Sequence, residues 1–140
     1  ADPAAGLRRS ARLRGGEMEA VLSEMGDMVA HLPGPRGPVT REAFIEMGRK
    51  MGADAMARQS DALAKRVDRW ERLAEIKCPT LCLWGEHDQF SPAADGRRLA
   101  EAVDWGVYVE LPGCGHFPTA EFPAEATAIL RDWLDEEFDG

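Results

Sequence analysis

Two polar side chains that could carry out acid–base chemistry each follow a short apolar segment of the chain. Asp88 comes shortly after the apolar run 80–84, and His116 comes shortly after the apolar run 106–111. If these runs are neighbouring parallel strands, about 4.8 Å apart, the residues beyond their carboxyl ends converge on one crevice. A carboxylate bonded to one imidazole nitrogen fixes the tautomer and leaves the other nitrogen free as a general base. The spacing therefore predicts an acid–base pair that requires a separate nucleophile.

Residues near this pair suggest two alternatives, a metal site and a thiol nucleophile. His87 could join His116 and Cys114 around zinc, but zinc needs three or four convergent ligands, and neither CxxC nor HExxH occurs in the sequence. Cys114 shares a loop with His116 rather than facing it, so a small residue in a tight Gly-Cys-Gly turn is favoured over a nucleophile. Considered singly, Asp88 would be a solvated acid and His116 a structural histidine, but their joint placement favours the catalytic pair. We therefore expect no metal and no cofactor.

The elements that must position this pair alternate strand and helix through the second half of the chain. The continuous apolar run 80–84 is typical of a parallel strand buried on both faces. Ser-Pro opens a predicted helix over about 91–103, and a second strand follows over 106–111. A final helix from Pro123 is expected to bury five apolar residues at helical spacing: Ala126, Ile129, Leu130, Trp133 and Leu134. This order indicates an α/β fold with a right-handed crossover between parallel strands.

The first half of the chain is predicted to be helical. Apolar residues recur at helical spacing over 18–32, and a loop rich in Pro and Gly, which should be neither helix nor central strand, follows over 32–38. Thr40 is the expected N-cap of a second helix. A third helix is expected to extend to Val67.

Methionine and aromatic residues are distributed unevenly, and this marks a boundary. All six methionines lie in the first 56 residues, whereas nine of the ten aromatic residues follow position 69. We therefore expect an architectural boundary near Trp70, with a helical region over 1–69 and an α/β region over 70–140. Ordinary helix packing is the favoured role of the methionines, and an adaptable surface over a ligand pocket is the alternative. They are Met18, Met25, Met28, Met47, Met51 and Met56.

Composition limits the class of protein. The 140 residues are 44% hydrophobic, enough for a core, and carry a formal net charge of −8. This acidic balance disfavours nucleic acid and anionic membranes as partners, and no run of about 20 apolar residues could span a bilayer. Three cysteines, an odd number with no recognisable signal peptide, favour free thiols in a reducing compartment. We therefore expect a cytoplasmic globular protein.

Two segments carry a resemblance to a known superfamily. Residues 78–88, Cys-Pro-Thr-Leu-Cys-Leu-Trp-Gly-Glu-His-Asp, resemble the strand-and-acid segment of the α/β-hydrolase superfamily. Residues 113–123, Gly-Cys-Gly-His-Phe-Pro-Thr-Ala-Glu-Phe-Pro, resemble its catalytic-histidine loop and the start of its final helix. A weaker similarity, over 52–59, is to the helical cap of lactonase- and esterase-like members. The resemblance implies that Asp88 is the triad acid, that His116 is the triad base, and that residues up to about 69 form the lid.

The sequence departs from the superfamily pattern at the nucleophile. The Gly-x-Ser-x-Gly elbow is absent, and the only serines are Ser10, Ser23, Ser60 and Ser91. Members of the superfamily carry nucleophile, acid and histidine in that order along the chain. We therefore expect the nucleophile and the oxyanion hole to precede Ala1, so that this chain is the cap plus carboxyl-terminal portion of a larger hydrolase.

The resemblance implies hydrolysis of a small carboxylic ester or lactone through a Ser–His–Asp triad, without a cofactor. Two alternatives remain open: a hydrolase-derived scaffold that binds a ligand or partner without catalysis, and a cofactor-free haloperoxidase or C–C bond hydrolase of the same superfamily. The chain alone is expected to be inactive. Because the 80–84 strand would expose an unpaired edge, the expected partner is the missing amino-terminal half or a second copy of the chain.

Overall fold

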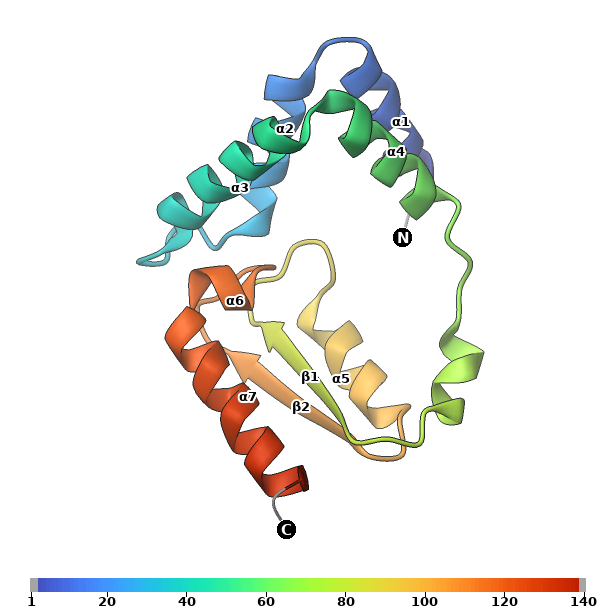
Figure 1. Ribbon diagram of the computed structural model, residues 1–140, viewed down its shortest axis with the longest axis vertical. Coiled ribbons are helices and arrows are strands. Elements are labelled where there is room, and N and C mark those ends of the chain that lie inside the picture. The colour runs from blue at the N-terminus through green and yellow to red at the C-terminus, as the bar shows by residue number, and fades with distance from the viewer. Residues whose placement is uncertain (1–2, 139–140) are drawn as a thin grey trace. The chain divides into compact units, whose positions relative to one another are not determined.

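The computed structural model describes residues 3–138 and divides into two compact units (Figure 1). The helical unit comprises the residues up to 27 together with 41–68, and the sheet unit comprises 28–40 together with the residues from 69 onward. The helical unit thus ends at residue 68, and the sheet unit continues from residue 69. The segment 28–40, however, belongs to the sheet unit, because its backbone is hydrogen-bonded to the loop that carries His116.

Four helices provide most of the helical unit, namely α1 (Pro3–Arg14), α2 (Met18–Val29), α3 (Gly37–Met51) and α4 (Ala53–Ala64). Helices α1 and α4 pack closely, since a Cβ atom at Gly6 would lie 3.1 Å from the Ala64 Cβ atom. The buried core of this unit consists of Leu13, Val21, Leu22, Ile45, Met56 and Ala57.

Several predicted helix boundaries in the first half are wrong. Helix α3 begins at Gly37 rather than at Thr40, because Pro38 lies in the first turn, where its missing N–H group costs no hydrogen bond. Helix α2 ends at Val29 rather than at residue 32. The turn that follows it is closed by a hydrogen bond from Gly34 N to His31 O.

Two further differences concern the ends of the first half. Helix α4 ends at Ala64, so Val67 lies outside it and is 64% exposed. Helix α1 was not predicted, because its arginine-rich sequence has only a weak apolar periodicity.

The sheet unit contains the two expected strands. Strands β1 (Thr80–Gly85) and β2 (Gly106–Leu111) pair in parallel, with Thr80 opposite Gly106 and Gly85 opposite Leu111. The parallel pairing predicted from the apolar runs is confirmed. The two carboxyl ends therefore lie at the same edge of the sheet.

Helices cover both faces of this two-stranded sheet. A 3-10 helix, η1 (Trp70–Glu75), precedes β1; α5 (Ala93–Glu101) joins the strands; α6 (Pro118–Glu121) and α7 (Pro123–Phe138) follow β2. Gly96 of α5 lies against the rings of Trp84 and Tyr108. Because successive side chains of a strand alternate between faces, Leu83 and Leu111 lie on the opposite face.

The face that carries Leu83 and Leu111 packs against α7. Ala126 of α7 is buried beside Leu111, with Ile129 partly buried in the same cluster. The prediction that Leu130 and Leu134 are buried is wrong, since they are 39% and 47% exposed. Two strands are too narrow to cover the whole apolar side of α7.

Candidate active site

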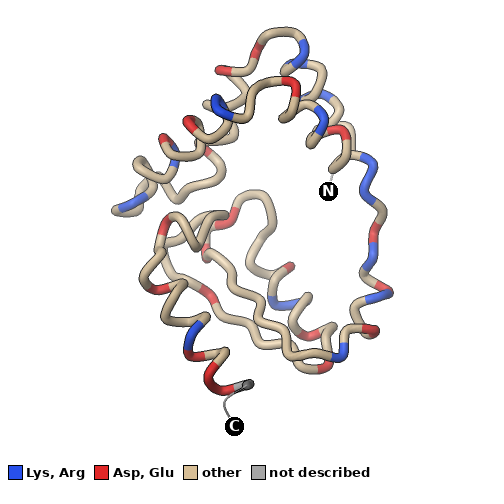
Figure 2. The backbone as a smooth tube through the Cα atoms, viewed as in Figure 1, with Lys and Arg blue, Asp and Glu red and all other residues tan. Residues whose placement is uncertain are grey.

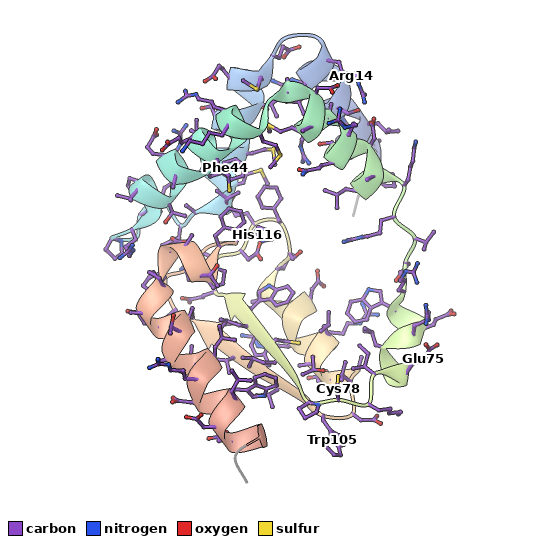
Figure 3. The ribbon with its side chains drawn as sticks, in the orientation of Figure 1. Arg14, Phe44, Glu75, Cys78, Trp105 and His116 are labelled. Atoms are coloured by element: carbon purple, nitrogen blue, oxygen red, sulfur yellow. The ribbon has the colours of Figure 1, made fainter. Side chains whose placement is uncertain are left out.

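Asp88 and His116 meet beyond the carboxyl ends of the two strands. The Nδ1 atom of His116 lies 2.8 Å from the Oδ2 atom of Asp88. The Asp88 side chain is 5% exposed and the His116 side chain is 36% exposed. Figure 3 shows His116 at the end of the sheet unit toward which both strand arrows point, whereas Cys78 and Trp105 lie at the other end. The structure thus brings together the two residues that the sequence singled out.

The carboxylate of Asp88 is fixed by the turn that leads to α5. Its Oδ1 atom accepts hydrogen bonds from the backbone N–H groups of Phe90, at 2.8 Å, and Ser91, at 2.9 Å. Its Oδ2 atom is thereby directed at the His116 ring. Both oxygens are in use, so the orientation of the carboxylate is set before any substrate binds.

The His116 ring has a defined environment and one ring nitrogen available for proton transfer. It contacts the rings of Phe90 and Phe117, whose centroids are 5.0 Å and 5.6 Å from its own. Because Nδ1 contacts the carboxylate, Nε2 is the nitrogen that can accept a proton. The arrangement can therefore serve as a general base held in one tautomer.

The loops that carry the acid and the histidine are bonded to each other through their backbones. His87 N donates to Cys114 O at 2.8 Å, and the carboxylate of Glu86 accepts a hydrogen bond from Gly113 N at 2.8 Å. A Cβ atom at Gly85 would lie 1.9 Å from the Gly115 oxygen, so only glycine permits this approach. These contacts therefore fix the two loops relative to each other.

Three residues of this region were not found from the sequence. Glu86 bonds the histidine loop, Glu121 is a fully buried carboxylate, and His31 stacks on His87 with ring centroids 3.9 Å apart. Glu86 and Glu121 lie within the two segments that carry the superfamily resemblance, so position in those segments was the available signal. No local signal links His31 to the site.

The cysteines do not supply a nucleophile to this site. Cys114 is fully buried, and burial together with the charge of Glu121 raises the pKa of its thiol to about 12. It is therefore a protonated thiol at neutral pH, as its turn position suggested. Burial also raises the pKa of Cys82, while Cys78 lies at the far end of the strands.

The remaining groups of the site do not form a metal cluster or a serine elbow. Among residues 3–138, no group of three or more His, Cys, Asp or Glu side chains is arranged to hold a metal ion. All four serines are within the described chain, and none lies in a strand-to-helix turn flanked by glycines: Ser10, Ser23 and Ser60 are in helices, and Ser91 precedes α5 between Phe90 and Pro92.

The helical unit has a shallow apolar depression of its own, with a volume of about 120 Å³. Its lining includes four of the six methionines, Met25, Met47, Met51 and Met56, with Phe44, Leu63 and the polar residues Arg9, Gln59 and Ser60. Met47 and Met51 are 49% and 42% exposed, whereas Met56 is buried. Some methionines therefore pack in the core and others line a surface.

The charged residues are mixed along the chain, as Figure 2 shows for both units. Many form exposed ion pairs, such as Arg12 with Glu24 at 2.6 Å and Lys77 with Asp104 at 2.6 Å. Such exposed pairs contribute little to stability. In the described part of the chain, no helix combines the length and the apolar character needed to cross a bilayer.

A family model and several known proteins match the chain. The model described as "Alpha/beta hydrolase family" matches residues 2–129. Epoxide hydrolase 3 of Xenopus tropicalis is 37% identical over 65 residues, which cover 46% of this chain and 18% of that protein. The 2-hydroxy-6-oxononadienedioate/2-hydroxy-6-oxononatrienedioate hydrolase 2 of Pseudomonas putida is 35% identical over 63 residues, which cover 45% of this chain and 22% of that protein.

Solved structures match over almost the whole chain. A thermophilic esterase from Thermogutta terrifontis superposes with a TM-score of 0.86 at 25% identity, and the match covers 96% of this chain and 50% of the esterase. The enol-lactonase from Burkholderia xenovorans LB400 gives a TM-score of 0.83 at 24% identity and 51% coverage of that enzyme, which shows the shared fold. This chain thus spans about half the length of these solved proteins. With the family model covering nearly all described residues, the α/β class and the resemblance inferred from two loops are confirmed, and the chain belongs to the alpha/beta hydrolase family.

Proposed function

We propose that this chain supplies the acid and the base of a Ser–His–Asp triad in a hydrolase that cleaves a small carboxylic ester or lactone. The observation that carries the proposal is the 2.8 Å contact between His116 Nδ1 and a carboxylate oxygen of Asp88 that is almost completely buried. The esterase and the enol-lactonase among the matched structures support this substrate class.

In the proposed reaction, His116 moves one proton in each half. Its Nε2 atom removes the proton of the serine hydroxyl as the serine oxygen attacks the acyl carbon, and then gives that proton to the departing alkoxide. In the second half it removes a proton from the water that attacks the acyl carbon, and then gives that proton to the serine oxygen as the bond between the acyl carbon and this oxygen breaks, which releases the carboxylic acid and the free serine. Asp88 holds the tautomer and stabilises the imidazolium that forms in both halves.

The serine and the oxyanion hole are proposed to come from a segment outside these 140 residues. Each strand of the described two-stranded sheet has one edge without a partner strand, and a sheet of this size is too small to be stable alone. Leu130 and Leu134 of α7 are exposed, and a further segment of protein that packed on α7 would bury these apolar side chains. We propose the nucleophile-bearing part of the same protein as this partner, and a second copy of the chain as the alternative.

Free cysteines favour a reducing, cytoplasmic setting.

A C–C bond hydrolase is the second candidate function. The 35% identical relative from Pseudomonas putida is named as a hydrolase of 2-hydroxy-6-oxononadienedioate, and the same acid–histidine pair would serve that reaction. A binding scaffold without catalysis is the third alternative, and it would lack turnover with every substrate tested.

The test uses the full-length protein encoded by the gene and a panel of p-nitrophenyl esters, a lactone and a vinylogous 1,5-diketone. We expect ester or lactone turnover that falls by several orders of magnitude in His116→Ala, because this removes the general base. The matched control is His87→Ala, which removes an exposed histidine of the neighbouring loop and should leave kcat within about threefold, a change of less than 1 kcal/mol. Residual His116→Ala activity within about tenfold of the parent would remove His116 from the mechanism.

A further inference from the structure

The side chain of Glu121 is an ionisable group placed in the interior of the sheet unit. It is 0% exposed, at the carboxyl end of α6. Its Oε1 atom accepts a hydrogen bond from His31 N at 2.9 Å, and its Oε2 atom accepts one from Gly115 N at 2.8 Å. Burial of a carboxylate is costly unless its oxygens are satisfied, and here two backbone N–H groups satisfy them.

We propose that Glu121 is a positioning residue for His116: its carboxylate bridges the backbone of the histidine loop to the segment 29–31 and so fixes the imidazole on Asp88. The proposal rests on the proposed function, in which His116 is the general base. Glu121 acts through the backbone N–H group of Gly115, the residue before His116, and is not bonded to the imidazole.

The backbone geometry around Gly115 explains why one carboxylate can have this effect. A Cβ atom at Gly115 would lie 2.8 Å from the Val29 oxygen and 2.8 Å from His31 N, so the loop lies directly against the segment 29–31. His116 N donates to Val29 O at 2.8 Å in the same contact. Glu121 therefore holds together two backbones that are already in contact.

The acid loop fixes the other side of the histidine loop, through His87 N bonded to Cys114 O at 2.8 Å. The loop is thus held between Asp88 and its neighbours on one side and the segment 29–31 on the other. Loss of the Glu121 bridge would leave the attachment to the segment 29–31 dependent on the single bond from His116 N to Val29 O. The imidazole would then keep its partner but lose part of its fixed direction.

A carboxylate suits this position better than the amide of the same size. The two donors, His31 N and Gly115 N, approach different oxygens, and a carboxylate accepts both. In Glu121→Gln one oxygen is replaced by an NH2 group that faces a backbone N–H group. One of the two bonds is therefore lost, and a buried donor remains without an acceptor.

The test compares Glu121→Gln in the full-length protein with two matched variants. Glu125→Gln removes an exposed carboxylate from the first turn of α7, and Ala126→Gly destabilises the core cluster beside Cys114 without touching the carboxylate. The measurements are kcat and KM for an ester, the melting temperature, and the proton NMR signal of the His116 Nδ1 hydrogen. The NMR signal reports the Asp88–His116 bond directly, and a merely structural role would leave it in place.

We expect Glu121→Gln to lower kcat by about 10- to 100-fold with KM changed by less than about threefold, because displacement of a catalytic group by about 1 Å costs this much. The His116 Nδ1 signal should weaken or broaden. Glu125→Gln and Ala126→Gly should keep both the signal and kcat within about twofold, even where Ala126→Gly lowers the melting temperature equally. Should Glu121→Gln fail to fold, Glu121→Asp takes its place, because its shorter side chain is expected to bond at most one of the two donors and so to lower kcat and weaken the signal as well.

Two results would overturn the positioning role. One is a Glu121 variant with unchanged kcat and an unchanged Nδ1 signal. The other is a loss of kcat in Ala126→Gly that equals the loss in Glu121→Gln when the two variants have the same melting temperature. Failure of the proposed function is recognised separately, by turnover that survives His116→Ala. In that case the Nδ1 signal alone decides: its loss in Glu121→Gln but not in Ala126→Gly supports the positioning role, and its retention in Glu121→Gln refutes it.

Discussion

Replacement of Asp88 by asparagine changes the site by one atom and tests the role of its charge. The Oδ1 atom of Asp88 accepts two backbone N–H groups, from Phe90 and Ser91. An asparagine oxygen would keep that place, so its NH2 group would face His116 Nδ1. The ring would then have to accept at Nδ1 and carry its proton on Nε2, which is the wrong tautomer for a general base.

The size of the expected loss follows from this geometry. In the proposed transition state the imidazolium of His116 faces a carboxylate whose side chain is 5% exposed. With charge centres roughly 4 Å apart and an effective dielectric constant of about 20, the attraction amounts to about 4 kcal/mol. Since each 1.36 kcal/mol is a factor of about ten, removal of the charge costs about 10³-fold in kcat. The reversed tautomer brings the expected loss to between about 10³- and 10⁴-fold.

The assay measures kcat and KM of the full-length protein with a p-nitrophenyl ester, beside circular dichroism and melting temperature. Asp95→Asn is the matched control, because Asp95 is an exposed acid on the neighbouring helix α5. We expect Asp88→Asn to remain folded with nearly unchanged KM, and Asp95→Asn to keep full activity. A loss of less than about tenfold in Asp88→Asn would refute the reasoning, because the pair would then contribute less than about 1.4 kcal/mol.

Three further predictions concern single residues, and a fourth concerns the whole chain. Gly85→Ala should lower the melting temperature and kcat together, with a destabilisation of about 1–3 kcal/mol, since the new Cβ atom would lie 1.9 Å from the Gly115 oxygen. The pKa of the Cys114 thiol is raised from 9.0 to about 12 in the folded chain, so its contribution to stability is present below pH 9 and is lost as the pH rises toward 12. In denaturant titrations, Cys114→Ala should make the alkaline loss of stability smaller, and the raised pKa values of Cys82 and Tyr108 should account for the loss that remains. In the full-length protein, Met51→Ala should alter the preference for ester chain length with little change in melting temperature. Met56→Ala should lower the melting temperature and leave that preference unchanged. If both variants lower the melting temperature and neither changes the preference, the two methionines serve in packing alone. The 140-residue chain alone should not hydrolyse esters, because it has no serine elbow, and ester turnover by the purified chain that depends on its histidine would contradict this.

The strands and the acid–histidine pair could be predicted because their signals are local. The apolar run 80–84 is bounded by proline and glycine, and the run 106–111 is bounded by Gly106 and Pro112. Parallel pairing then requires Asp88 and His116 to lie at one edge of the sheet.

The contacts that hold the histidine loop could not be predicted, because they are non-local backbone contacts. Val29 O accepts a hydrogen bond from His116 N, and His31 N donates to the Glu121 carboxylate, both from a segment that the composition boundary assigned to the cap. Backbone N–H and C=O groups are common to every residue, so the sequence contains no sign of these partners. The exposure of Leu130 was missed for a related reason, since helical periodicity marks an apolar face but not what covers it.

The assignment of the segment 28–40 to the sheet unit has a consequence for biosynthesis. His31 and Glu121, which share a hydrogen bond, are 90 positions apart in the chain. Closing a loop of that length costs about 4 kcal/mol of chain entropy, and prior folding of the helical unit reduces this cost because it shortens the flexible part of the loop. On the ribosome, the segment 28–40 emerges long before the histidine loop that satisfies it. We therefore expect the helical unit to fold first and the histidine loop to order last, so that the contact between Asp88 and His116 would become fixed only after Glu121 had been made.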